Sequence, residues 1–143
     1  KHQVREMIRG LSRDKIVIIS THILEEVTAV CTRAIIIANG AIVSDSTPSE
    51  LEAQSRYHGA VTVRLVEPER DQAALNDALY GLASVNGFEA EADGSFVAFP
   101  AEGATSLLSD VNEALQSNQI AVSSVQVERG RLDEVFRTVT GGA

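Results

Sequence analysis

The feature that most constrains the fold is a short, uninterrupted aliphatic run, Ile16 to Ile19, in which three of the four side chains are isoleucine. A run of this length, rich in β-branched residues, is typical of a strand that is covered on both faces, as in a parallel sheet. We therefore expect residues 15–20 to form a buried strand of an α/β sheet. The run ends at a polar triplet that contains His22.

Helical and turn patterns lie on both sides of this run. Apolar residues with helical spacing predict one helix over residues 4–11 and another over residues 23–31. Asn39 and Gly40 lie between two apolar runs, and this pair predicts a β-hairpin because both turn residues need positive φ. Two helices and three strands are thus expected before residue 45.

The next segment carries a helix-start signal. Thr47 and Glu50 have the spacing of a capping box, and Pro48 stands at the first helical position. These residues predict a short helix that fades at Ser55. The first part of the chain would then end on a helix.

From residue 61 onward the spacing of apolar residues changes. Alternating and helical spacings give the order strand, helix, strand, strand, helix, strand, which is the split-βαβ or ferredoxin-like plan. A last helix with an amphipathic pattern is expected over residues 132–139. The expected strands cover residues 61–65, 88–92, 95–99 and 120–127, and the expected helices residues 75–82 and 107–115.

Charge divides the chain at a similar place. Residues 1–58 hold 7 Lys/Arg and 7 Asp/Glu, whereas residues 59–143 hold 5 and 13, which accounts for the whole net charge of −8. An acidic second half argues against nucleic acid as a partner. We predict two domains, residues 1–55 and residues 59–143.

The sequence lacks the residues that nucleotide binding and metal binding require. No Gly-x-x-x-x-Gly-Lys-[Ser/Thr] loop is present to hold phosphates, and no Cys/His cluster has the spacing of metal ligands. Glu25 and Glu26 are adjacent, so we expect a solvated helix surface rather than a facing acid–base pair. We expect the chain alone to bind no ATP, cofactor or metal and to have no ATPase activity. No stretch has the length of a membrane span.

His22 is the one candidate site residue. A histidine at a strand-to-helix junction can be a helix cap or a satisfied polar group. Ligands of open α/β sheets, however, bind beyond the carboxyl ends of strands, and an imidazole N–H there could donate to a phosphate oxygen or to a polarised water. The residues alone leave both interpretations open.

Two segments resemble the ATP-binding subunits of ABC transporters. The pattern Ser-Thr-His-Ile-Leu-Glu-Glu-Val at residues 20–27 is similar to the switch-histidine region of subunits that serve export-type permeases, including the drug-efflux, antibiotic-efflux and gliding-motility groups. Residues 131–140 resemble the tail of the same subunits, which closes a C-terminal accessory domain. The resemblance implies that residues 1–55 are the C-terminal remnant of a P-loop ATPase sheet, in the C-terminal part of a longer protein.

The resemblance also implies a function and a site. His22 would be the catalytic switch histidine, which contacts the γ-phosphate of ATP in a parent protein that uses ATP and Mg. The implied partners are a membrane permease and a second ATPase subunit in a homodimer, on the cytoplasmic side of the membrane. The whole subunit would couple ATP binding and hydrolysis to transport.

Other possibilities stay open. Residues 59–143 could be a small-molecule sensor or a dimerisation module, and the chain could be a self-contained protein without ATPase activity. A first part of about 55 residues cannot bury a full core. We therefore expect its apolar side chains to pack against the acidic domain, against another copy in a homo-oligomer, or through a swapped strand. These side chains are Ile8, Ile16, Ile18, Ile35 and Ile37.

Overall fold

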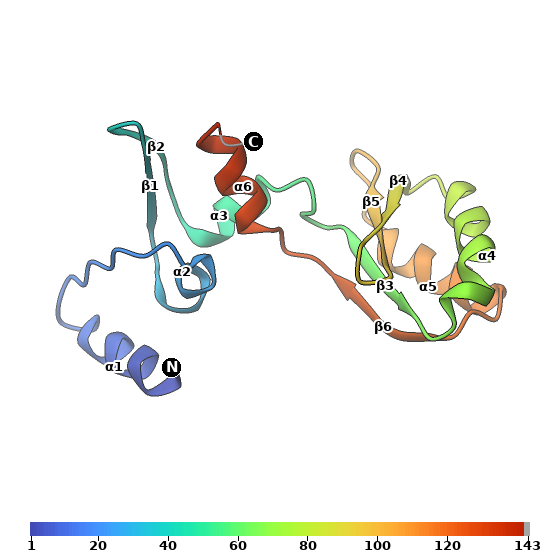
Figure 1. The fold of residues 1–143 in the computed structure, drawn as a ribbon, viewed down its shortest axis with the longest axis horizontal. Helices are drawn as coiled ribbons and strands as arrows, with labels where there is room; N and C mark the ends of the chain where they lie inside the picture. Colours follow the sequence, from blue (N-terminus) through green and yellow to red (C-terminus); the bar gives the residue numbers. More distant parts are fainter. Residues whose placement is uncertain (142–143) are drawn as a thin grey trace. The chain divides into compact units, whose positions relative to one another are not determined.

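The computed structural model describes residues 1–141 and mixes α and β structure (Figure 1). Within these residues lie six helices and two antiparallel sheets, one of two strands and one of four. The chain divides into two compact units. The first unit contains residues 1–55 and the segment from Arg131 onward, and the second contains residues 56–130.

The first unit combines four helices with a hairpin. Its sheet is β1 paired with β2, and its last helix follows the second unit in sequence. The elements are α1 (His2–Leu11), α2 (Leu24–Val30), β1 (Ala34–Ala38), β2 (Ala41–Ser46), α3 (Pro48–Ala53) and α6 (Leu132–Val139).

The predicted hairpin is confirmed. Asn39 and Gly40 have φ of 52° and 75°, the left-handed conformation that the tight turn requires. Across the two strands, Arg33 donates two hydrogen bonds to the carboxylate of Asp45, at 2.7 and 2.6 Å. Both strand pairing and a bidentate ion pair therefore hold this hairpin.

The predicted helix start at Thr47 is confirmed as well. Thr47 Oγ1 accepts from the Glu50 amide at 3.2 Å, and Glu50 Oε2 accepts from the Thr47 amide at 2.8 Å. The helix that begins there, α3, packs on α6. Leu51 of α3 and Val135 of α6 are buried, with 3% and 2% of their surfaces exposed.

The prediction of a strand over residues 15–20 is wrong. This segment forms no strand, and Ile16 and Ile18 are 93% and 90% exposed. A strand needs hydrogen-bonding neighbours, and β1 and β2 of this unit pair only with each other among the described residues. Ile35 and Ile37 are also exposed, so the packing expected for these isoleucines is not found within the described chain.

The second unit follows the predicted order of elements. Its sheet has the strand order β4-β5-β3-β6, and every neighbouring pair is antiparallel. The elements are β3 (Val61–Leu65), α4 (Pro68–Tyr80), β4 (Val85–Ala90), β5 (Ser95–Pro100), α5 (Leu107–Ser117) and β6 (Val122–Val127).

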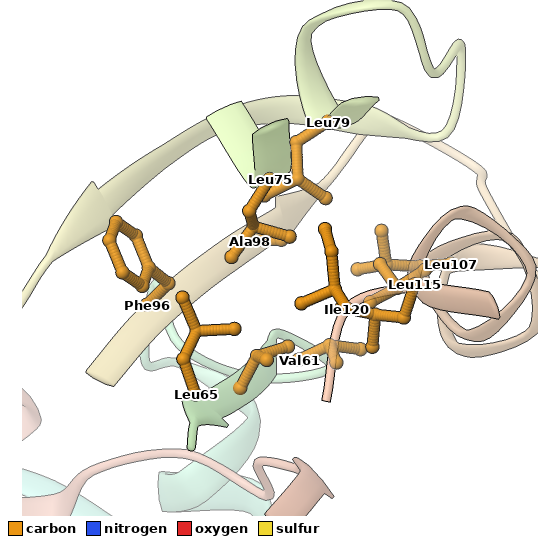
Figure 2. Packing of buried hydrophobic residues seen from close by; sticks show 11 residues of the cluster. Val61, Leu65, Leu75, Leu79, Phe96, Ala98, Leu107, Leu115 and Ile120 are labelled. Carbon is orange, nitrogen blue, oxygen red and sulfur yellow. The ribbon is translucent and has the colours of Figure 1, made fainter. Parts of the chain in front are cut away.

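The core of the second unit lies between one face of this sheet and its two helices (Figure 2). Alternate residues of β3 point into this core, as the period of two along a strand requires. Leu75 and Leu79 of α4 are four residues apart and therefore share the helix face that meets the sheet. Helix α5 contributes Leu107, Val111 and Leu115.

The two ends of the second unit run side by side as a short antiparallel neck, residues 58–60 and 128–129. The Gly59 amide donates to the Glu128 carbonyl at 2.8 Å, and the Glu128 amide donates to the Ala60 carbonyl at 2.8 Å. His58 Nδ1 lies 2.6 Å from the Arg129 carbonyl oxygen. Backbone pairing thus continues beyond β3 and β6.

Candidate functional site

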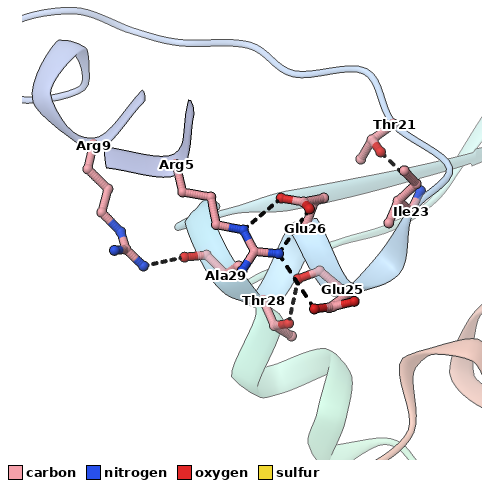
Figure 3. A network of polar contacts seen from close by, with 8 residues as sticks. All are labelled: Arg5, Arg9, Thr21, Ile23, Glu25, Glu26, Thr28 and Ala29. Atoms are coloured by element: carbon pink, nitrogen blue, oxygen red, sulfur yellow. Dashed lines mark hydrogen bonds and ion pairs between the residues drawn. The ribbon is translucent and has the colours of Figure 1, made fainter. Parts of the chain in front are cut away.

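His22 lies between the extended segment 15–20 and α2, one residue before the N-cap of that helix. Beside it, Thr21 Oγ1 accepts a hydrogen bond from the Ile23 amide at 3.0 Å, which shapes the local turn (Figure 3). Ser20, Thr21 and His22 are all exposed. Among residues 1–141 the imidazole has no hydrogen-bond partner, so His22 is not the cap of α2 in this structure.

Helix α2, which follows His22, is attached to α1 by a bidentate ion pair (Figure 3). Arg5 donates to both carboxylate oxygens of Glu26, at 3.1 and 2.9 Å. A weaker contact of 3.5 Å joins Arg5 to Glu25. The side chains of Arg5 and Glu26 are only 24% and 25% exposed, so this pair is better shielded from solvent than a surface pair.

The Arg5–Glu26 pair shifts the pKa values of both residues, and it also bears on the prediction that Glu25 and Glu26 form a solvated helix surface. The hydrogen bond from Arg5 lowers the pKa of Glu26, and the same bond raises the pKa of Arg5. Both groups are therefore charged at neutral pH. The expectation of a solvated surface holds for the exposed Glu25 but is wrong for Glu26, whose carboxylate faces α1.

A second arginine holds the other end of α2. Arg9 donates to the carbonyl oxygen of Ala29 at 2.7 Å (Figure 3). It also forms an ion pair with Glu6 at 2.6 Å. A cation at the last turn of a helix satisfies a carbonyl that has no intrahelical partner. The short helix behind His22 is thus held to α1 near both of its ends.

The arrangement presents one imidazole to solvent on a fixed scaffold. A neutral imidazole can donate one N–H and accept at its other nitrogen, and a protonated one donates from both. Residues 1–141 contain no group of three His, Cys, Asp or Glu side chains that could hold a metal ion. The chemistry that the imidazole itself offers at this position is hydrogen bonding to an anion or to a water.

The second unit contains a separate hollow. A cavity of about 420 Å³ lies at the end of the sheet where β3 begins and α5 starts. Its lining side chains are mostly apolar, its exposed walls include much polar surface, and His58 and Thr105 are the side chains there that can form hydrogen bonds. The apolar lining includes Val61, Pro100, Leu107, Leu108 and Val127.

Comparison with known proteins gives two relatives that match along nearly the whole chain. Daunorubicin resistance ATP-binding protein DrrA3 of Streptomyces coeruleorubidus is 29% identical over 138 residues, 96% of this chain and 41% of the relative. Daunorubicin resistance ATP-binding protein DrrA2 of the same organism is 30% identical over 142 residues, 97% of this chain and 42% of the relative. The chain is related to the ATP-binding subunits of ABC transporters.

The resemblance seen in the sequence is therefore confirmed, and it extends over both compact units. No protein-family model matches the chain. The chain spans about two fifths of the length of the two relatives. No helix among residues 1–141 combines the length and apolar character needed to cross a bilayer.

The sequence predicts His22 as a site residue, which stays a prediction, and gives no signal for the residues that attach its helix to α1. Arg5 and Glu26 are 21 residues apart, and no short motif signals a pair at that distance. Ser55, which was expected only to mark a helix end, is buried and hydrogen-bonded to the first turn of α6. Both pairings depend on how elements pack, which local spacing does not report.

Proposed function

We propose that the chain is the C-terminal part of an ATP-binding subunit that couples ATP binding and hydrolysis to transport by a membrane permease. The observation that carries this proposal is the match over 96–97% of the chain to two proteins named as ATP-binding. The chain holds no phosphate-binding loop. In the whole subunit, ATP and Mg would therefore be bound chiefly by residues outside these 143.

His22 would be the contribution of this chain to the nucleotide site. Its imidazole is exposed and without a hydrogen-bond partner in the described chain, and its turn is attached through α2 to α1. A free N–H held in this way would donate to an oxygen of the γ-phosphate. The interaction would exist before hydrolysis and be lost after it, so that His22 would report which nucleotide is bound.

The proposal includes partners and a place in the cell. ATP bound between two such subunits would close a homodimer, and hydrolysis would open it. The permease would contact the subunit on the cytoplasmic side of the membrane. The acidic composition of the chain supports a protein partner rather than nucleic acid.

We also propose two domains of different origin. Residues 1–55 would be the end of the P-loop ATPase sheet, in which the exposed Ile16 and Ile18 would gain strand neighbours from the rest of the subunit. Residues 59–143 would be a ferredoxin-like accessory domain. The strand order β4-β5-β3-β6, with α4 and α5 on one sheet face, supports this for the part up to residue 130.

The test replaces His22 in the whole subunit that contains this chain. His22→Ala should lower the ATPase rate about 100-fold, the usual scale for removing one donor to a reacting anion, and should leave the fold unchanged. His22→Gln keeps an N–H donor and should recover part of the rate. His2→Ala, at an exposed histidine of α1 outside the candidate site, is the matched control. A wild-type rate in His22→Ala would refute the role of His22.

A second candidate function rests on the cavity in the second unit. Its volume of about 420 Å³ and its mixture of apolar and polar wall surface suit a small molecule that carries both kinds of group, so this unit could sense such a ligand. Thermal-shift screening of the 143-residue chain would test this, with Ala104→Leu to fill the cavity. Compounds that raise the melting temperature of the wild type and of Ala104→Leu equally would count against a sensor.

Sedimentation of the chain tests the other alternative, a dimerisation module.

A further inference from the structure

The start of helix α6 differs from that of α3. Its N-cap is Arg131, whose side chain makes no capping hydrogen bond. The N3 residue is Glu134, which in an ordinary capping box would accept from the N-cap amide of its own helix. Helix α3 of the same unit has this ordinary arrangement, with Thr47 and Glu50.

In α6 the hydroxyl of Ser55 lies between the two groups that a capping box would join directly. The Arg131 amide donates to Ser55 Oγ at 3.0 Å, and Ser55 Oγ donates to Glu134 Oε2. The partners are 76 and 79 residues away from Ser55 in sequence. Ser55 is 5% exposed, so this bridge is shielded from competing water.

The position of Ser55 makes it a link between two helices. It follows Gln54, the C-cap of α3, and its amide donates to the Glu52 carbonyl at 3.1 Å. Leu51 of α3 and Val135 of α6 are both buried, and the two helices pack on each other. Because the cap comes from α3, the start of α6 depends on a residue that precedes the whole second unit.

The second unit occupies the sequence between Ser55 and Arg131. Its own ends are paired in the antiparallel neck, so they leave the unit together. A covalent segment with paired ends brings its two flanking residues together at a far lower entropic cost than an unfolded segment of equal length would. Formation of the Ser55 bridge is thereby favoured by the folded second unit.

We propose that Ser55 acts as a latch. Its hydroxyl caps α6 from a distant part of the chain, and this cap keeps α6 helical and docked on α3 as long as the two ends of the second unit stay paired. An event that parts these ends would open the latch and release α6. The latch would make the conformation of the last helix of the first unit depend on the state of the second unit. This inference does not depend on the proposed nucleotide chemistry.

Amide hydrogen exchange on the 143-residue chain tests the cap. Loss of a helix cap has an effect of about fivefold on a local opening equilibrium, so Ser55→Ala should speed exchange at residues 132–139 by about that factor. Exchange at core amides of the second unit, such as Val63 and Val97, should not change. Ser49→Ala, at an exposed serine of α3, is the matched control and should leave α6 unaffected.

A double-mutant cycle tests whether Ser55 acts through Glu134. Glu134→Ala should also speed exchange in α6, and the double variant should be no faster than the more affected single variant. Fully additive effects, or unchanged α6 exchange in Ser55→Ala, would overturn the latch. Faster exchange throughout α1, α2 and α6 together would overturn it too, because that pattern indicates general destabilisation.

Destabilising the second unit tests whether α6 depends on the folded state of that unit. Leu75 is fully buried in its core, so Leu75→Ala should raise exchange in the second unit. The latch requires that exchange at residues 132–139 rise with it while α1 remains as in the wild type. Unchanged protection of α6 in this variant would show that the helix does not depend on the second unit.

Discussion

Asp93 illustrates how the surroundings of a single residue set its titration. Its carboxylate accepts from the Ser95 hydroxyl at 2.6 Å and from the Ser95 amide at 3.0 Å, in the turn between β4 and β5. Arg64 of β3 adds an ion pair at 2.7 Å. These donors, led by the hydrogen bonds from Ser95, lower the pKa of Asp93 to about 2.

This lowered pKa predicts a pH dependence of stability. A carboxyl group whose folded pKa lies below its unfolded value stabilises the fold above the unfolded value and loses that effect as pH falls toward the folded one. The contribution of Asp93 should therefore vanish between about pH 4 and pH 2. In urea melts at a series of pH values, Asp93→Asn should lose less stability over this window than the wild type.

The control for this experiment is Asp77→Asn, at an exposed aspartate of α4. It should follow the wild-type pH profile. If Asp93→Asn and the wild type lose equal stability between pH 4 and pH 2, the hydrogen bonds from Ser95 do not hold the carboxylate in its charged form.

At the same scale, the candidate site was partly predictable. The position of His22 at the start of a helix follows from the apolar run before it and the helical spacing after it, and both are local patterns. The Arg5–Glu26 pair depends on α1 and α2 meeting in space, so it has no local signature. Sequence therefore predicts a candidate site residue but not the contacts that attach its helix to α1.

Among the elements, α3 and the segment 15–20 show where sequence prediction succeeds and fails. The start of α3 depends on contacts between residues three apart, which the sequence places together in any context. A strand over residues 15–20 depends on neighbours that the described chain does not offer. The hairpin at Asn39 was predictable for the same reason as α3, because its turn is local.

The cap of α3 gives a prediction at this scale. Thr47→Ala removes the acceptor for the Glu50 amide and should lower the free energy of unfolding of the first unit by about 1 kcal/mol. Far-UV circular dichroism during urea unfolding measures this change. Thr47→Ser keeps the hydroxyl and should retain most of the stability. Equal losses in both variants would mean that the hydroxyl does not contribute through the cap.

At the scale of the whole molecule, the positions of the tyrosines allow one unit to be followed separately by spectroscopy. The chain has two tyrosines and no tryptophan, and Tyr57 and Tyr80 both lie in the second unit. Tyrosine fluorescence therefore follows that unit, whereas circular dichroism follows both. The order of elements in the second unit was predictable because each strand and helix there has a complete apolar face within the chain.

Leu75→Ala tests the core of the second unit. Removing a fully buried leucine should lower the free energy of unfolding seen by tyrosine fluorescence by about 2–5 kcal/mol. Leu108, on α5, is 41% exposed, so Leu108→Ala should cost much less. Similar losses in the two variants would contradict the packing in Figure 2.

The exposed segment 15–20 has a consequence for handling the chain in solution. An extended, aliphatic stretch with strong β propensity and no proline is a template for self-association into cross-β fibres. The charged residues Arg13, Asp14 and Lys15 directly precede the aliphatic run that begins at Ile16. Such charges act as gatekeepers that slow the stacking of strands. The colloidal behaviour of the 143-residue chain is thus governed by a balance between four aliphatic side chains and the three charges beside them.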